Sequence, residues 1–150
     1  MSSFKFTPEN EVKFQEYVSR YPIIDSVMLP ALWLVQEQES WVSPEAMVYV
    51  ADKLGKTPIQ VYEVATFYTM FNLKPIGKHH IELCKTLSCM LCGSRDIKNY
   101  IKESIGIEPG QTSQDGLFHL SEVECLGACG GAPMFEIGRA SCRERVYTIV

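Results

Sequence analysis

Five cysteines in the second half of the chain are the residues best suited to bind a metal centre. They are Cys84, Cys89, Cys92, Cys125 and Cys129. Thiolates are soft ligands, and four of them suit either an iron–sulfur cluster or a zinc ion. The same loops are rich in glycine, which lets the backbone approach closely and point amides at anionic sulfur. These glycines are Gly93, Gly127, Gly130 and Gly131.

The spacing of the cysteines leaves the choice of ligands open. One set takes the first three together with Cys125 and has the spacing of plant-type ferredoxins. The other takes one pair from each of two loops, Cys84 with Cys89 and Cys125 with Cys129. Zinc could use Cys89, Cys92 and the second pair, because structural zinc favours such close pairs. Reduced structural cysteines are the remaining alternative.

The composition is that of an ordinary globular protein, with 46% hydrophobic and 21% charged residues in 150. The net charge of −4 offers no basic surface, so we expect no nucleic-acid partner. The longest apolar run, residues 27–35, is too short for a membrane helix and contains Pro30, so we expect no direct membrane insertion. The start of the chain lacks a secretory signal, and we therefore expect a cytoplasmic protein with reduced cysteines.

The first half of the chain predicts helices. Three of them begin where a hydroxyl residue precedes proline, at Thr7, Ser43 and Thr57. The hydroxyl accepts from a free first-turn amide, and proline supplies a suitable φ. Gln60 completes a capping box with Thr57. An apolar stripe predicts the third helix, which Gly55 ends, and this stripe consists of Ala46, Met47, Val50, Ala51 and Leu54.

Four short helices, none of them stable alone, imply a small bundle over residues 1–74. One of these helices is expected over about residues 26–39. The spacing of Phe67, Tyr68 and Phe71 predicts that these aromatic residues belong to the core of the bundle.

The second half of the chain changes period. Residues 79–83, 117–120 and 133–137 predict strands, and residues 94–104 predict a helix that ends at Gly106. A strand, a helix and further strands favour a small sandwich of thioredoxin type over residues 75–137. The expected fold class is therefore α+β, with a helical bundle followed by a thioredoxin-like domain.

Residues 138–150 differ from the rest of the chain. They contain three of the five arginines, whereas all nine lysines lie at or before Lys102. Residues 136–146 (EIGRASCRERV) are also what a common sequencing-adapter sequence encodes. We therefore interpret residues 138–150 as a non-native tail and leave Cys142 out of the site. On this hypothesis a closing strand and a final helix are missing, and resequencing of the locus is the test.

Several runs resemble one known family, the NuoE-type subunit of respiratory complex I (NADH-quinone oxidoreductase). Two of them contain the cysteines: residues 84–89 (CKTLSC) and residues 125–133 (CLGACGGAP). Residues 115–118 (DGLF) fit as well. In the helical half the similar runs are residues 41–46 (WVSPEA) and residues 63–75 (EVATFYTMFNLKP). The resemblance covers roughly residues 10–137.

The resemblance implies one 2Fe–2S cluster on Cys84, Cys89, Cys125 and Cys129, with Cys92 as a neighbour. It also implies a flavin- and NAD-binding partner subunit whose FMN exchanges single electrons with the cluster, and a further iron–sulfur subunit. The helical bundle would serve mainly for docking, and the complex would hold the chain at the inner face of the membrane. This chain has no nucleotide-binding motif or catalytic triad, so we expect no complete active site on it.

Two positions depart from the family pattern. His119 stands where the family usually has Ser or Thr, and the pair Gly130 and Gly131 is typical of the related subunits of NAD-linked hydrogenases and formate dehydrogenases. Such a subunit is therefore one alternative. A zinc-stabilised thioredoxin-like adaptor and a free-standing ferredoxin are the other two.

Overall fold

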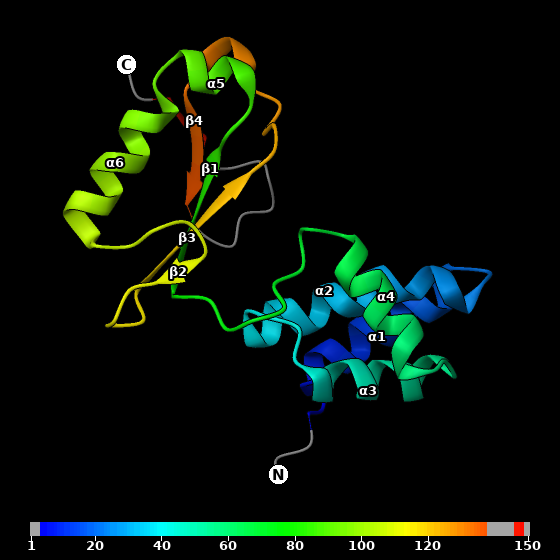
Figure 1. Ribbon diagram of the computed structural model, residues 1–150. Helices are drawn as coiled ribbons and strands as arrows, with labels where there is room; N and C mark the ends of the chain where they lie inside the picture. Colours follow the sequence, from blue (N-terminus) through cyan, green and yellow to red (C-terminus); the bar gives the residue numbers. More distant parts are fainter. Residues whose placement is uncertain (1–3, 138–145, 149–150) are drawn as a thin grey trace. The chain divides into compact units, whose positions relative to one another are not determined.

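The computed structural model describes residues 4–137 and the backbone of residues 146–148. The chain forms two compact units, which divide between Pro75 and Ile76. The first unit consists of helices and the second of a sheet with helices (Figure 1). No helix in the described part of the chain is long and apolar enough to cross a membrane.

Helices make up the first unit, and their starts follow the capping signals in the sequence. Thr7 and Ser43 accept hydrogen bonds from first-turn amides, and Thr57 forms the expected capping box with Gln60. These predictions are therefore confirmed. The elements are α1 (Pro8–Arg20), a 3₁₀ turn η1 (Ile24–Val27), α2 (Met28–Glu39), α3 (Pro44–Leu54) and α4 (Pro58–Phe67).

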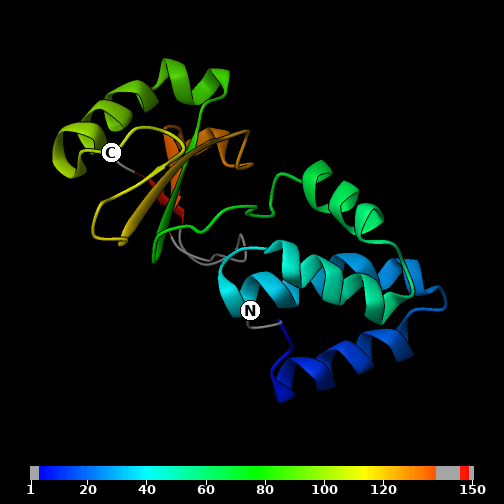
Figure 2. The same cartoon turned by 60° about the horizontal axis from the view of Figure 1, so that its bottom comes forward.

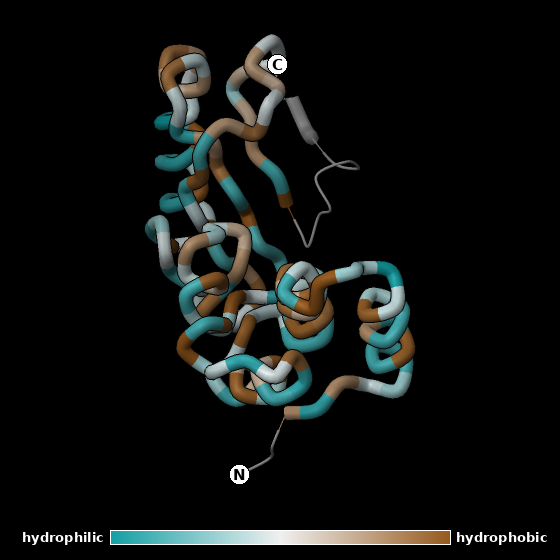
Figure 3. The backbone as a smooth tube through the Cα atoms, turned by 90° about the vertical axis from the view of Figure 1, so that its right-hand side faces the viewer, coloured by the Kyte–Doolittle hydropathy of each residue, from teal (hydrophilic) through white to brown (hydrophobic). Residues whose placement is uncertain are grey.

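The core of the first unit forms where the apolar faces of these helices meet. All five residues of the predicted stripe on α3 are buried, and Gly55 ends the helix with a φ of 64°. Figure 3 shows hydrophobic and hydrophilic residues interleaved along these helices, as expected when only one face is buried. Aromatic rings of Phe4, Phe6 and Tyr49 join the same cluster in edge-to-face contacts.

The prediction that three aromatic residues near the end of α4 are core was wrong for two of them. Phe71 is buried, but Phe67 is 77% exposed and Tyr68 is 39% exposed. The helix ends at Phe67 and Tyr68 has an extended backbone, so the helical spacing does not continue to Phe71. The Phe67 ring instead meets Tyr68 edge to face.

The second unit is a mixed sheet with strand order β2-β3-β1-β4-β5. The central strand β1 (His79–Cys84) pairs in parallel with β3 (Phe118–Val123) and antiparallel with β4 (Met134–Ile137). The helix α6 (Ser94–Ile105) connects the two parallel strands and packs on one face of the sheet (Figure 2). Short elements complete the unit: α5 (Leu87–Leu91), β2 (Gln111–Thr112), the 3₁₀ turn η2 (Cys129–Gly131) and β5 (Val146–Thr148).

Alternation along β1 separates two environments. Ile81 and Leu83 belong to the apolar cluster of α6 together with Leu120, Phe135 and Ile137. Cys84 points to the opposite face, where it forms a separate cluster with Cys89 and Met134. The α+β class with a thioredoxin-like domain is thus confirmed.

The expectation that residues 138–150 supply no strand was wrong. Val146–Thr148 form β5 and pair antiparallel with β4, in the register Phe135 to Tyr147. Three residues of extended backbone suffice, since strand pairing uses main-chain groups and tolerates most side chains. Residues 138–145 and 149–150, and with them Cys142, lie outside the described part. That the tail is non-native stays a prediction.

Candidate metal centre

The first cysteine pair lies at the carboxyl end of β1. Cys84 is the last residue of the strand, and Cys89 lies in α5, a short helix absent from the sequence-based prediction. Both side chains are 1% exposed and pack with Met134, surrounded by Leu126, Ala128 and Ala132. An apolar shell of this kind limits the access of water to sulfur.

Hydrogen bonds favour the charged form of Cys84. Burial raises the pKa of this thiol, but hydrogen bonds from Thr86, from Cys89 and from the Leu126 amide outweigh it and hold the pKa below its usual value. The Cys84 Sγ and Thr86 Oγ1 atoms are 3.1 Å apart. Burial and the hydrogen bond to Cys84 raise the pKa of Cys89. Cys84 therefore ionises first in this pair, and Cys89 donates to it.

The second pair lies in the loop after β3. Cys125 and Cys129 are exposed, and their Sγ atoms are 3.3 Å apart. The Gly127 amide donates to Cys125 Sγ at 3.3 Å, which confirms for Gly127 the expected role of glycine in this loop. Gly127 has a φ of 78°, a conformation that glycine adopts without strain. The hydrogen bond to Cys125 raises the pKa of Cys129.

The two pairs influence each other electrostatically. The charge of Cys84 contributes to the raised pKa of Cys129, and the charge of Cys129 contributes to the raised pKa of Cys89. Since such interactions fall off with distance, β1 and the loop after β3 bring thiols from the two ends of the domain together. The sequence contained no signal for the roles of Thr86 and the Leu126 amide.

Cys92 differs from the other four thiols. It is exposed at the end of α5, and in the part of the chain that the structure describes its thiol forms no hydrogen bond with another cysteine. The described cysteines are all free. No three His, Cys, Asp or Glu side chains among the described residues are arranged to hold a single metal ion. The thiols form two pairs instead.

Two pairs of thiols suit a particular chemistry. A 2Fe–2S cluster takes four thiolates, two for each iron, whereas a single ion needs its ligands to meet at one point. The donor set, the amides directed at sulfur and the apolar shell therefore fit a two-iron cluster. The fold and this site define a class of protein, a thioredoxin-like domain with paired cysteine ligands.

Comparisons with known proteins identify the family. The family model for thioredoxin-like [2Fe-2S] ferredoxins matches residues 14–147. The chain belongs to the thioredoxin-like [2Fe-2S] ferredoxin family.

The chain is similar to curated relatives over most of its length. One NADH-quinone oxidoreductase subunit, from Rickettsia bellii, is 44% identical over 140 residues, which cover 91% of this chain and 84% of the relative. NADH-quinone oxidoreductase subunit 2 of Thermus thermophilus is 37% identical over 134 residues, covering 88% and 74%. The expected resemblance to complex I subunits is thereby confirmed.

A solved structure shares the fold. The NAD⁺-reducing [NiFe]-hydrogenase in its H₂-reduced state superposes with a TM-score of 0.64 at 22% identity. The match covers 73% of this chain but only 18% of the hydrogenase chain.

Proposed function

We propose that Cys84, Cys89, Cys125 and Cys129 hold one 2Fe–2S cluster, which exchanges single electrons with the FMN of an NADH-oxidising flavoprotein. The observation that carries the proposal is the meeting of two thiol pairs from separate loops within electrostatic reach of each other. When bound, the cluster supplies the one-electron carrier. Membership of a 2Fe–2S ferredoxin family supports the choice of this cofactor.

The protein side chains and amides prepare the site for an anionic group. The Leu126 and Gly127 amides direct partial positive charge at Cys84 and Cys125. Met134 and the surrounding apolar residues exclude water from the first pair. The second pair remains exposed, so we place the entry and exit of electrons on the side of Cys125 and Cys129.

The proposed partner is the flavin- and NAD-binding subunit of an NADH:quinone oxidoreductase, with a further iron–sulfur subunit in the same complex. The relatives named as subunits of NADH-quinone oxidoreductase support it. The complex would hold the chain on the cytoplasmic side of the membrane, at its inner face. Gly130 and Gly131 favour a second candidate, the equivalent subunit of an NAD-linked hydrogenase or formate dehydrogenase.

The helical unit is proposed to dock on the partner. Several large apolar side chains of α4 and the following loop are exposed, which is unusual for residues with no binding role when they lie so close in sequence. They are Ile59, Tyr62, Phe67 and Met70.

Single Cys→Ser substitutions test the ligand assignment. Replacing Cys84, Cys89, Cys125 or Cys129 should abolish or severely alter the 2Fe–2S absorbance and the EPR signal of the reduced protein. Cys92→Ser is the matched control and should leave both nearly intact. If Cys92 proves essential and Cys129 dispensable, the plant-ferredoxin ligand set is correct instead. Co-purification with a flavoprotein tests the partner, and zinc without EPR signal would favour the adaptor alternative.

A further inference from the structure

A small cavity lies beside the carboxyl end of β1, and nothing in the proposed electron-transfer role uses it. Its volume is about 230 Å³, and its lining includes Lys85, Ser94, Arg95, Lys98 and Glu122. It lies where the parallel strands β1 and β3 meet the first turn of α6 (Figure 1). In α/β structures ligands bind outside the carboxyl ends of parallel strands, next to helix N-termini.

The N-terminus of α6 has no side-chain cap. Gly93 precedes the helix with a φ of 102° and offers no side-chain acceptor. Its carbonyl accepts from the amides of Asp96 and Ile97 at 3.0 and 3.3 Å. Among the described residues no backbone acceptor exists for the amides of Ser94 and Arg95. Two donors at the positive end of the helix macrodipole are thus available.

The Ser94 side chain is a second and independent sign of a ligand. Ser94 is only 4% exposed, lines the cavity, and has no hydrogen-bond partner for its hydroxyl within the described ranges. No wholly enclosed side-chain N or O atom in those ranges lacks a partner. The hydroxyl is therefore open to the cavity. A nearly buried hydroxyl without a partner is costly, and a ligand oxygen would satisfy it.

The charges around the cavity are mainly positive. Lys98 pairs with Glu122 at 3.1 Å, and Lys85 pairs with the exposed Glu124 at 3.3 Å. Arg95 forms no ion pair with any residue that the structure describes. The first turn of α6 also contains Asp96, which does not line the cavity. The guanidinium of Arg95 therefore provides a free planar donor of the kind that binds oxyanions.

We propose that this cavity binds a single phosphate group, held by the Ser94 hydroxyl, the Ser94 and Arg95 amides and the Arg95 guanidinium. Amides at a helix N-terminus together with an arginine are a recurrent phosphate-binding arrangement. The volume lies below the roughly 300–1,000 Å³ of pockets for drug-sized ligands, so it suits one phosphate group and not a whole nucleotide. The group is either free phosphate or the phosphate of an ester whose remainder stays outside.

Calorimetric titration of the full chain tests the proposal at constant ionic strength, with inorganic phosphate and, separately, adenosine monophosphate. We expect saturable phosphate binding that Arg95→Gln weakens roughly tenfold, the effect of one charge-assisted hydrogen bond. Ser94→Ala should weaken it severalfold. The matched control is Lys102→Gln, which removes a positive charge from the same helix outside the cavity and should leave the affinity within about twofold.

Each outcome decides the matter. Binding of both probes supports the site and assigns it a phosphate ester, and binding of inorganic phosphate alone supports it and assigns the free ion. The absence of saturable binding overturns the proposal. An equal loss in Lys102→Gln and Arg95→Gln also overturns it, because the effect would then be one of general charge. Since Arg95 and Lys102 are both exposed, these two variants should fold, and far-UV circular dichroism checks this.

Discussion

The two units of this protein are held together in different ways. The helical unit has one large apolar cluster, to which every helix contributes. The sheet unit has two smaller clusters on opposite faces of the sheet, and one of these consists of Cys84, Cys89 and Met134. The first unit is therefore stabilised mainly by burial of apolar surface, whereas part of the second depends on the state of its thiols.

Buried polar groups differ between the units in the same sense. In the helical unit Gln36 is satisfied by the backbone: it donates to the Met70 carbonyl at 2.8 Å and accepts from the Asn72 amide at 2.6 Å. In the sheet unit Glu82 and Glu136 face each other on β1 and β4, and burial raises the pKa of both carboxyls. The helical unit is a scaffold, and the polar interior of the sheet unit is titratable.

Removal of the proposed cluster should separate the two units most strongly. A ligand present at a thousand times its Kd stabilises a fold by about 4 kcal/mol, and chelation of iron removes this stabilisation from the sheet unit alone. We expect the melting transition of the sheet unit to fall while helical circular dichroism persists. Thermal melts before and after anaerobic chelation measure this. Equal destabilisation of both units would contradict the comparison.

Truncation of a core leucine should have the opposite distribution. Leu32 is fully buried in α2, and Leu32→Ala should lower the free energy of unfolding of the helical unit by about 3 kcal/mol because a cavity remains. The EPR signal of the cluster should not change. Val12→Ala on the exposed side of α1 is the control and should cost less than about 0.5 kcal/mol. Loss of the EPR signal in Leu32→Ala would mean that the units are coupled.

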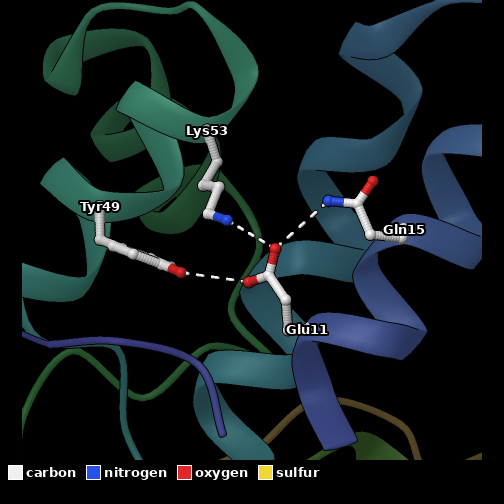
Figure 4. Close-up of polar contacts among 4 residues, drawn as sticks. All are labelled: Glu11, Gln15, Tyr49 and Lys53. Atoms are coloured by element: carbon white, nitrogen blue, oxygen red, sulfur yellow. Dashed lines mark hydrogen bonds and ion pairs between the residues drawn. The ribbon is translucent and has the colours of Figure 1, made fainter. Parts of the chain in front are cut away.

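The smallest expected effect concerns an ion pair in the helical unit. Lys53 Nζ lies 2.6 Å from Glu11 Oε1, and Gln15 and Tyr49 also donate to this carboxylate (Figure 4). The Lys53 hydrogen bond holds the pKa of Glu11 below its usual value, and Glu11 raises the pKa of Lys53. The side chains are 30% and 34% exposed, so solvent screening limits the contribution to about 0.5 kcal/mol.

The signs of these two shifts define a pH window. The contribution of Glu11 is present above its unfolded pKa of about 4.3 and is lost as the pH falls through the lower folded value. That of Lys53 is present below about pH 10.4 and is lost as the pH rises through the higher folded value. Urea denaturation of Glu11→Gln between pH 3 and 7 measures the first, with Glu9→Gln as the control. A difference between wild type and Glu11→Gln that does not shrink toward pH 3 would refute this assignment.

Local structure in this protein follows from short-range signals in the sequence. Thr7, Ser43 and Thr57 begin helices because their hydroxyls satisfy amides only three residues away. The stripe on α3 and the end of that helix at Gly55 followed from the helical period and from the backbone freedom of glycine. The strands and α6 were predictable for the same reason, because each signal lies within a few residues of the element that it specifies.

Contacts between distant groups depend instead on how the strands pair. Spacing along the chain left both Cys92 and Cys129 as candidate ligands. The parallel pairing of β1 with β3 brings Cys129 within electrostatic reach of Cys84 and leaves Cys92 exposed. The same pairing places Glu122 beside the first turn of α6, where the cavity around Arg95 forms. Sequence separation constrains distances over a few residues only, whereas strand register sets them across the whole domain.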